Sequence, residues 1–368
     1  MPFDRTARVR PLAATLAATA IAVIAASSCQ GNGAEISIVS YNVHNLFDGV
    51  DAGTEYDEFS VTEGRWDDTR YRERLGLTAD AIKRISREGG AGPAPDVVAL
   101  AEIENGEVAR DLALLLGPGY ASAAAPASGS ATTVGIITRL PMTGLRAHAT
   151  LSPPSGSPSR PILEAELQAD GGSLVIFVNH WKSRKEGRAE TEPDRIVQAE
   201  ALRAAIAERA LSMPEAAIVA CGDFNEDPEA FAASPPGFRT ALALDSAAVG
   251  TDDETSPIVL GPGGSAEEGY GGQCLRLASS WLLPGDKAAG SYAFRGAWER
   301  IDAFFLGPSL LDGRGIEYLS FPAAAPPALL SETGFPRPWS ASDRGGYSDH
   351  LPILLRLRSL PPAGPGIQ

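Results

Sequence analysis

The sequence predicts one α/β domain in which two β-sheets pack face to face with helices on the outside. Short apolar runs rich in Val and Ile alternate with amphipathic segments along most of the 368 residues. No internal repeat and no clean linker interrupts this alternation. Hydrophobic residues make up 44% of the chain and charged residues 21%. This is ordinary globular composition, which excludes disordered, collagen-like and coiled-coil proteins.

The first part of the alternation predicts two strands, a loop and two helices. Residues 36–43 form a β-rich run, and the acidic, Gly-containing stretch 48–68 predicts a loop. Apolar residues recur at helical spacing over 70–87, so we expect an amphipathic helix there. Residues 96–101 are typical of a buried strand, and 108–116 suit a second helix.

The rest of the alternation predicts more strands and one long helix. The segment 193–211 begins with Pro and carries apolar residues at helical spacing, so we expect a helix that starts at Pro193. Residues 252–273 are rich in Gly and Ser and predict a long surface loop. The runs that we expect to form strands are 133–138, 162–167, 174–179, 217–221, 298–306 and 351–357.

Residues 1–28 are typical of an export signal. Three arginines precede an apolar run over 12–26, and small residues follow it. That run is short for a helix that spans a membrane. Cys29 comes directly after the small residues, as at the processing site of a bacterial lipoprotein. We therefore expect an exported protein with a lipid anchor at Cys29 in the cell envelope. Simple cleavage and release as a secreted or periplasmic protein is the alternative.

Charge and cysteine content limit the partners and the chemistry. The chain has 31 Lys and Arg against 46 Asp and Glu, a net charge of -15. Such a protein has no general attraction for nucleic acid or anionic membranes, so a polyanionic substrate needs a local basic patch or bound metal cations. Three cysteines exclude a disulfide-stapled scaffold. Cys221 lies in an apolar run and is expected as a buried thiol, with pairing to Cys274 as the alternative.

Polar side chains stand at the ends of the predicted strands. Strand ends are where a rigid sheet aims side chains into a shared cleft. Taken singly, each residue has a plain structural explanation; the Asp-Phe-Asn segment, for example, is typical of an Asx turn. The residues are Asn42, Glu102, Asn179, His180, Asp223, Asn225, Arg300, Asp302, Ser348, Asp349 and His350.

The residue types favour a hard metal cation. Carboxylate oxygens suit Mg²⁺, and the absence of a Cys/His cluster from the sequence argues against zinc. Glu102 ends an apolar run and is preferred as ligand over Glu104, which would share its face in a regular strand. Acidic residues also gather in the loop at 48–58. Solvation explains them, with an added Ca²⁺ site as the minor alternative.

Six segments occur in a set order along the chain. They are Ser40-Tyr41-Asn42-Val43, 98–102 (VALAE), 178–183 (VNHWKS), 222–225 (GDFN), 300–302 (RID) and 348–352 (SDHLP). In this order they resemble the endonuclease/exonuclease/phosphatase superfamily of metal-dependent phosphoesterases with the DNase-I-like fold. The continuation Asn45-Leu46-Phe47-Asp48 resembles a secreted bacterial subgroup.

The resemblance implies a four-layer α/β sandwich of two packed β-sheets flanked by helices. It covers nearly the whole chain after the leader. We therefore expect a catalytic domain over 36–358 and a disordered tail over 359–368.

The resemblance also implies hydrolysis of a phosphate ester and a role for each catalytic residue. Asp223 would orient or deprotonate the attacking water, and Asn225 would hold the phosphate. Asp302 would accept a hydrogen bond from His350 and fix its tautomer. His180 would protonate the leaving group or bind the phosphate. Either Asp223 or His350 is the general base.

The remaining expectations concern metal and substrate. Asn42 and Glu102 would hold Mg²⁺, for which Mn²⁺ or Ca²⁺ are possible substitutes, and Asp349 would bind a second metal or a metal-bound water. Arg160 and Lys182 would supply positive charge to the phosphate. One departure concerns the strand at 133–138, which often begins with Asp or Asn in relatives and here begins with Thr. His180 therefore lacks the Asp or Asn side chain that often supports the corresponding His in relatives.

These expectations favour one function over two alternatives. The first is an exported Mg²⁺-dependent phosphoesterase that hydrolyses phosphodiester bonds, as a nuclease on extracellular nucleic acid. The second is a phosphatase or phosphodiesterase acting on nucleotides, inositol phosphates or lipid head groups. The third is a non-catalytic surface-binding protein that kept the fold. No obligate protein partner is implied.

Overall fold

The computed structural model follows the alternation expected from the sequence. It describes residues 33–360 apart from 129, 154, 228–237, 246–255, 264–269, 271–273, 286 and 323–324. The export signal, the anchor residue Cys29 and all of the expected tail beyond residue 360 therefore lie outside the described residues. Ser359 belongs to the last strand, so the folded domain extends past the expected boundary at 358.

The first sheet is built around a long strand that carries the first polar motif. β1 (Glu35–Leu46) pairs in parallel with β2 (Val97–Ile103) and antiparallel with β16 (Ile353–Ser359). The other members are β3 (Ala121–Ala124), β4 (Thr133–Thr138) and β15 (Ile316–Ser320). The strand order is β15-β16-β1-β2-β4-β3. Both long neighbours of β1 thus hold it at the centre of this sheet.

The second sheet has eight strands. β7 (Gly172–His180) pairs in parallel with β8 (Ala217–Asp223), which pairs antiparallel with β14 (Asp302–Leu306). The other strands are β5 (Met142–Ser152), β6 (Ser157–Ala169), β9 (Leu242–Leu244), β10 (Ile258–Gly261) and β11 (Leu275–Ser279). The order is β5-β6-β7-β8-β14-β11-β10-β9. The three strands that carry the later motifs are therefore neighbours.

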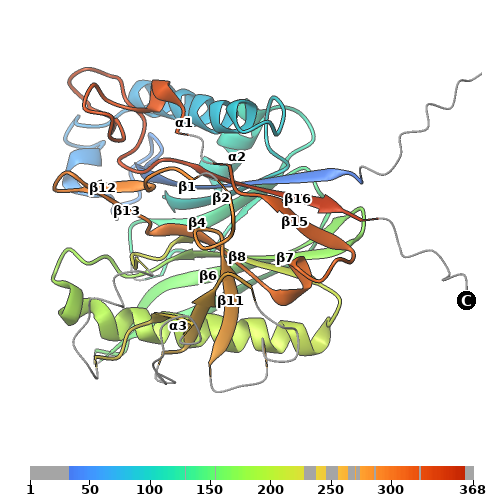
Figure 1. Cartoon of the computed structure of the whole chain (residues 1–368). Coiled ribbons are helices and arrows are strands. Elements are labelled where there is room, and N and C mark those ends of the chain that lie inside the picture. Colours follow the sequence, from blue (N-terminus) through green and yellow to red (C-terminus); the bar gives the residue numbers. More distant parts are fainter. Residues whose placement is uncertain are drawn as a thin grey trace, which may run out of the picture. The chain divides into compact units, whose positions relative to one another are not determined.

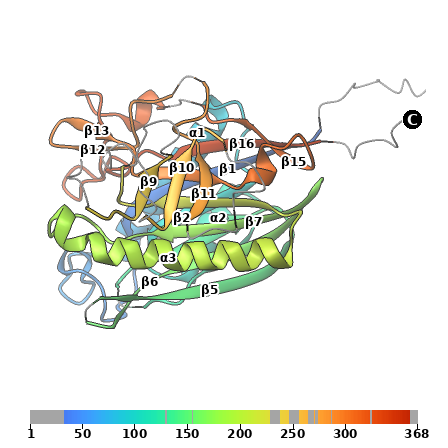
Figure 2. The same ribbon diagram turned by 60° about the horizontal axis from the view of Figure 1, so that its bottom comes forward.

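The two sheets pack face to face because their strands alternate between two apolar faces. In β1, Ile36 and Ile38 join the core between the sheets, whereas Val39 and Tyr41 join a second core under the helices. α1 (Asp68–Glu88) and α2 (Gly106–Leu116) cover the first sheet, and α3 (Arg188–Ser212) covers the second (Figures 1 and 2). Each fully buried aliphatic side chain contributes about 1.5–3 kcal/mol. The four-layer sandwich is confirmed.

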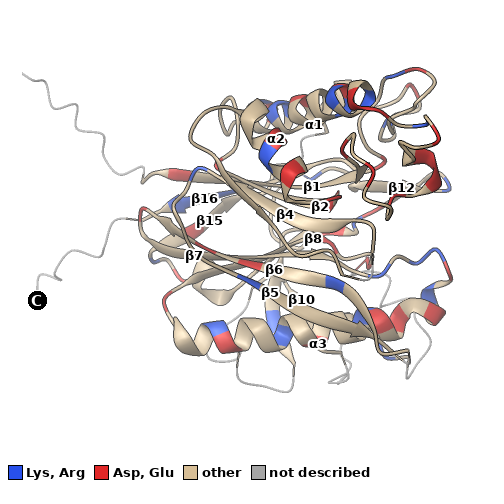
Figure 3. Ribbon diagram, turned by 180° about the vertical axis from the view of Figure 1, so that it is seen from behind, with Lys and Arg blue, Asp and Glu red and all other residues tan. Residues whose placement is uncertain are grey.

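The helix ends follow local chemistry, with one correction. Asp67 caps α1 and Asn105 caps α2, each through its side-chain oxygen. α3 begins at Arg188, so the prediction that it starts at Pro193 was wrong. Pro193 lacks one backbone donor, but buried ion pairs of Arg195 with Glu192 and Glu226 hold the extra turn. Basic and acidic residues are interspersed along α1 and α3 (Figure 3).

Two further expectations about elements were wrong. The stretch 252–273 is not only a loop, since β10 lies within it and its Ile258 and Leu260 are buried in the core between the sheets. The apolar run there is only four residues long, so its Gly-rich flanks hid it. The expected strand 298–306 is broken. Its first part is β13 (Ala297–Glu299), which forms a separate hairpin with β12 (Tyr292–Phe294).

The remaining described elements and cysteines complete the domain. Three short 3₁₀ helices lie at Asp57–Phe59, Pro308–Leu310 and Pro327–Leu329. Cys221 and Cys274 are both buried free thiols, so the expected buried thiol is confirmed and the alternative pairing is wrong. No helix within the described ranges is long and apolar enough to cross a membrane.

Candidate active site

The strand pairing brings the sequence motifs to one edge of the sandwich. Asp223 ends β8 and stands opposite both His180 at the end of β7 and Asp302 at the start of β14. Asn42 lies toward the end of β1, opposite Ala101 in β2, one residue before Glu102. His350 lies just before β16, the antiparallel neighbour of β1. Residues up to 308 positions apart in the sequence therefore face one another.

Asn42 joins the two sheets at this edge. Its amide Nδ2 donates to Glu102 Oε1 at 3.2 Å and to Asp223 Oδ2 at 3.0 Å. Its Oδ1 accepts from the backbone N–H of His44 at 3.0 Å. Because Asn42 is almost fully buried, this amide holds one carboxylate from each sheet at a fixed separation.

A backbone irregularity aims Glu102 into the site. In β2 the preceding even-numbered residues, Val98 and Leu100, face the helices, so a regular strand would turn Glu102 away from Asn42. The pairing of β2 shifts between Ala101 and Ile103, and Glu102 has a φ of 63°. Such a bulge re-aims one side chain and is found next to active sites. The Glu102 side chain is 17% exposed and faces the site.

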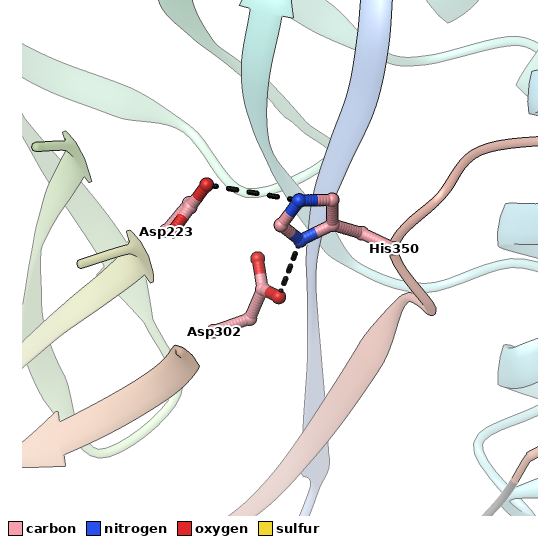
Figure 4. A group of neighbouring side chains, drawn as sticks. All are labelled: Asp223, Asp302 and His350. Carbon is pink, nitrogen blue, oxygen red and sulfur yellow. Dashed lines mark hydrogen bonds and ion pairs between the residues drawn. The ribbon is translucent and has the colours of Figure 1, made fainter. Parts of the chain in front are cut away.

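Asp302 and His350 form a buried hydrogen-bonded pair. His350 Nδ1 lies 2.7 Å from Asp302 Oδ2, and its Nε2 lies 3.9 Å from Asp223 Oδ2 (Figure 4). Burial lowers the pKa of His350, but the carboxylates of Asp302, Asp223 and Asp349 outweigh it and raise that pKa well above its usual value. Ser348 Oγ accepts from the His350 backbone and donates to the Asn42 carbonyl. Asp302 thus orients the imidazole, and Ser348 holds the backbone that carries it.

Asp223 is a buried carboxyl in the middle of the group. Burial and the neighbouring Asp302 raise its pKa to about 7, against the opposing effect of His350. Its Oδ1 accepts from the Asn225 backbone at 2.8 Å, the Asx turn that the sequence predicts. Its other oxygen, Oδ2, faces Asn42 and both imidazoles. A perturbed carboxyl so placed is typical of a catalytic site.

His180 is held as a neutral imidazole beside Arg160. Burial, Arg160 and His350 lower the pKa of His180 well below its usual value. Arg160 Nη1 lies 3.3 Å from His180 Nε2, which also lies 3.6 Å from Glu102 Oε1. Within the described residues His180 Nδ1 has no hydrogen-bond partner, and Thr133 Oγ1 donates instead to the Ala125 carbonyl. The Thr in this strand therefore gives His180 no support.

Residues 37–235 match the model of the endonuclease/exonuclease/phosphatase family. The chain belongs to the endonuclease/exonuclease/phosphatase family. It is therefore a metal-dependent phosphoester hydrolase. The search of curated proteins gave no match.

Several solved structures are similar to this member of the family. Humanized D. rerio TDP2 is 17% identical, with 88% of this chain and 99% of that chain covered and a TM-score of 0.48. TDP2 from C. elegans is 16% identical, with 90% and 77% covered and a TM-score of 0.48. An endonuclease/exonuclease/phosphatase family protein from Bacteroides thetaiotaomicron is 14% identical, with 88% and 98% covered and a TM-score of 0.44.

The residues at this edge fit a divalent cation. Three carboxylates lie together, those of Glu102, Asp223 and Asp302, and Asp302 Oδ1 has no hydrogen-bond partner in the described part of the chain. Asp223, Asp302 and His350 can each bring one ligand atom within 4.8 Å of the others. His350 Nδ1 is already hydrogen-bonded to Asp302, so the atoms that remain to bind a metal are mainly oxygens. Crowded carboxylates that share one site need a cation to remain ionised together.

Three of the expected site residues have contacts outside the central group. Lys182 Nζ binds Glu186 Oε1 at 2.8 Å. The amide of Asn225 donates to the Trp181 carbonyl at 3.1 Å, so it ties two loops together. Asp349 is 36% exposed and lies 3.6 Å from His44 Nδ1, at the rim of the group.

Sequence reasoning missed two features that shape the site. The ring of Tyr292 lies 4.6 Å from that of His350. Buried Arg74 donates to the carbonyls of Val43 and Asn45 and so holds a turn in which His44 and Asn45 both have positive φ. A charged residue on an amphipathic helix is normally read as solvated, so no sequence signal marks Arg74.

Replacing Gly222 with Ala is expected to destabilise the domain by about 3 kcal/mol or more. Gly222 has a φ of 132°, and a Cβ there would lie 1.9 Å from the Asn179 carbonyl oxygen. Gly76→Ala, in open space on α1, is the matched control and should stabilise by about 0.5–1 kcal/mol. Thermal unfolding measures both. A Gly222→Ala protein as stable as wild type would contradict this packing between β7 and β8.

Proposed function

We propose that the protein is an exported Mg²⁺-dependent phosphoesterase that cleaves phosphodiester bonds in nucleic acid outside the cytoplasm. One observation carries the hydrolytic part. The amide of Asn42 bridges Glu102 and Asp223, while the Asp302–His350 pair faces the same Asp223 oxygen. Phosphodiester hydrolysis needs cationic neutralisation, an activated water and a protonated leaving group. The groups gathered here can meet each need.

Each residue has a role in that proposal. Asp302 holds the proton on His350 Nδ1, which leaves Nε2 directed toward Asp223. A water bound between Asp223 Oδ2 and His350 Nε2 would have a polar group on either side. Asp223, or His350 when its Nε2 is unprotonated, would take the proton from that water. Arg160 and His180 lie side by side next to this group, where they would bind a phosphate oxygen.

The metal belongs on the Glu102 side of the group. Glu102 and Asn42 would hold Mg²⁺, whose charge would neutralise the phosphate. Mn²⁺ or Ca²⁺ are possible substitutes. Asp349, which lies at the rim, remains our proposed ligand for a second metal or a metal-bound water. The surplus of negative charge around Asp223 supports a metal at Glu102 and Asn42 and a second metal or metal-bound water at Asp349.

The charge near the site favours a second candidate substrate class. Lys182 is paired with Glu186 and Arg184 with Glu299, and the whole chain has a net charge of -15. Proteins that bind long nucleic acids normally present an excess of Lys and Arg. A phosphatase or phosphodiesterase acting on nucleotides, inositol phosphates or lipid head groups is therefore the alternative.

Export and anchoring are supported by the residue pattern of the leader, in which small residues and Cys29 follow an apolar run. β1 starts at Glu35, opposite Arg358, at the end of the sheet remote from Asn42. A tether at this end of the domain would leave the catalytic edge accessible. Partition of the mature protein into detergent and labelling with palmitate would support anchoring at Cys29; a purely aqueous, unlabelled protein would overturn it.

The function is tested with a substrate panel. Mature protein is incubated with plasmid DNA, bis-p-nitrophenyl phosphate and p-nitrophenyl phosphate, each with Mg²⁺ or with EDTA. Mg²⁺-dependent nicking of the plasmid and turnover of the diester are expected. Turnover of the monoester alone would favour the phosphatase. Silence on all three substrates would point to a binding protein without catalysis and would overturn the proposal.

A further inference from the structure

Helix α1 buries a cation whose hydrogen bonds, in the described part of the chain, all go to backbone carbonyls. Arg74 is 2% exposed and donates to the carbonyls of Val43, His44 and Asn45. Burial lowers the pKa of Arg74 to about 10, so the guanidinium stays charged at neutral pH. A buried cation is costly unless its donors are used, so the three carbonyls are what stabilises Arg74 here.

The carbonyls that Arg74 binds lie in an irregular part of β1. The pairing of β1 with β2 breaks off after Asn42 and resumes at Leu46, so residues 43–45 stand opposite one residue, Glu102. The pairing of β1 with β16 has ended before this point. In the described sheet, residues 43–45 therefore have no strand partner, and their carbonyls need donors from elsewhere. Arg74 supplies those donors from the helix.

Two residues of this turn have a backbone conformation that side chains disfavour. His44 and Asn45 have φ values of 58° and 60°, in the left-handed region. In this conformation the backbone N–H of His44 donates to Asn42 Oδ1 at 3.0 Å. Two consecutive left-handed residues other than Gly persist only where their surroundings hold them. The hydrogen bonds from Arg74 hold this turn from the side of α1.

The bond from His44 decides which end of the Asn42 amide enters the site. With Oδ1 occupied by the His44 N–H, Nδ2 is left to donate to Glu102 Oε1 at 3.2 Å and to Asp223 Oδ2 at 3.0 Å. An amide turned the other way would place its oxygen against both carboxylates, where no hydrogen bond can form between acceptors. An unbroken series of hydrogen bonds and backbone thus leads from Arg74 to the carboxylates of the site.

We propose that Arg74 is a positioning residue of the hydrolytic reaction, which holds the turn at 43–45 and through it the orientation of the Asn42 amide. The inference rests on the proposed function, because the carboxylates that Asn42 bridges are those of the proposed site. Packing alone does not call for a cation at this place. The Arg74 guanidinium lies 5.8 Å from the ring centre of Phe59 and 5.1 Å from that of Trp339, where an apolar side chain would also pack.

The test replaces Arg74 with Met, which keeps a long side chain and removes its donors. For bis-p-nitrophenyl phosphate in Mg²⁺, kcat should fall by roughly 10- to 100-fold, the usual cost of losing an outer-shell partner of a metal site. In the NMR spectrum, the side-chain amide signal of Asn42, assigned by its loss in Asn42→Ala, should shift and exchange faster with water. Arg74→Lys should lie between Arg74→Met and wild type in both measurements, because one ammonium lacks the forked donors of Arg.

Arg72→Met is the matched control. Arg72 lies two residues earlier on α1, and its side chain is 74% exposed and paired with Asp68. This variant should keep both the wild-type kcat and the wild-type Asn42 signal. Thermal unfolding of every variant shows that the measurements are made on folded protein.

The outcomes separate this inference from the proposed function. An Arg74→Met protein with an unchanged Asn42 signal would overturn the positioning role, whatever its rate. A shifted signal together with the wild-type kcat would overturn it as well, because the orientation of Asn42 would then not matter for the reaction. If Arg74→Met does not fold, Arg74→Lys decides by the same two measurements. Wild-type protein that is silent on the substrate panel would overturn the proposed function, and the Asn42 signal would still decide whether Arg74 orients that side chain.

Discussion

Replacing His350 with Ala is expected to lower kcat for bis-p-nitrophenyl phosphate by roughly 10²–10⁴-fold, the contribution of a positioned acid–base group. The substitution removes the imidazole whose Nδ1 lies 2.7 Å from Asp302 and whose Nε2 faces Asp223. It also leaves Asp302 buried beside Asp223 without its partner. The pH at which the residual activity is highest should therefore shift. The measurement is initial rate against substrate concentration, with thermal unfolding on the same samples.

His148→Ala is the matched control for that substitution. His148 lies on β5 and pairs with buried Glu164, which also accepts from Arg209 on α3 and so keeps a partner when the imidazole is lost. We expect an unchanged kcat. If His350→Ala retained the wild-type rate, or if both substitutions lowered it equally, the assignment of the Asp302–His350 pair to the reaction would be wrong.

Replacing Glu102 with Gln is expected to raise the Mg²⁺ concentration needed for half-maximal activity by at least about 10- to 100-fold. Loss of an outer-shell partner already costs a metal site that much, and Glu102 is our proposed direct ligand. EDTA should abolish the activity of the wild-type enzyme. The measurement is the rate of diester cleavage across an Mg²⁺ titration.

Glu104 provides the matched control, since in the sequence it is the alternative to Glu102 as metal ligand. Its Oε2 accepts from the Asp48 backbone at 2.7 Å, and burial raises its pKa to about 7. Glu104→Gln should therefore keep the wild-type Mg²⁺ dependence. An enzyme whose Mg²⁺ requirement changed with Glu104 and not with Glu102 would show that the bulge in β2 does not direct the ligand.

The sequence predicted most elements, because they depend on short-range patterns, and it marked candidate residues for the site. Runs of alternating or continuous apolar residues marked the central strands, and the polar residues that follow them marked the catalytic edge. β10 and the break before β14 were missed, because a four-residue strand between Gly-rich flanks and a two-residue interruption leave no periodic signal. The start of α3 was missed because tertiary ion pairs, rather than Pro193, hold its first turn.

The sequence by itself determined which residue types are available for the chemistry: the oxygen ligands, the two imidazoles and the order of their motifs. Only the tertiary structure decided how they meet. Glu102 contacts Asn42 because a bulge turns its side chain to the other face of β2. Lys182 binds Glu186, four residues further along the chain. The hairpin of β12 and β13 is placed by contacts with His350 and Asp302. Sequence patterns report periodicity along the chain, whereas these contacts join segments tens to hundreds of residues apart and depend on sheet register.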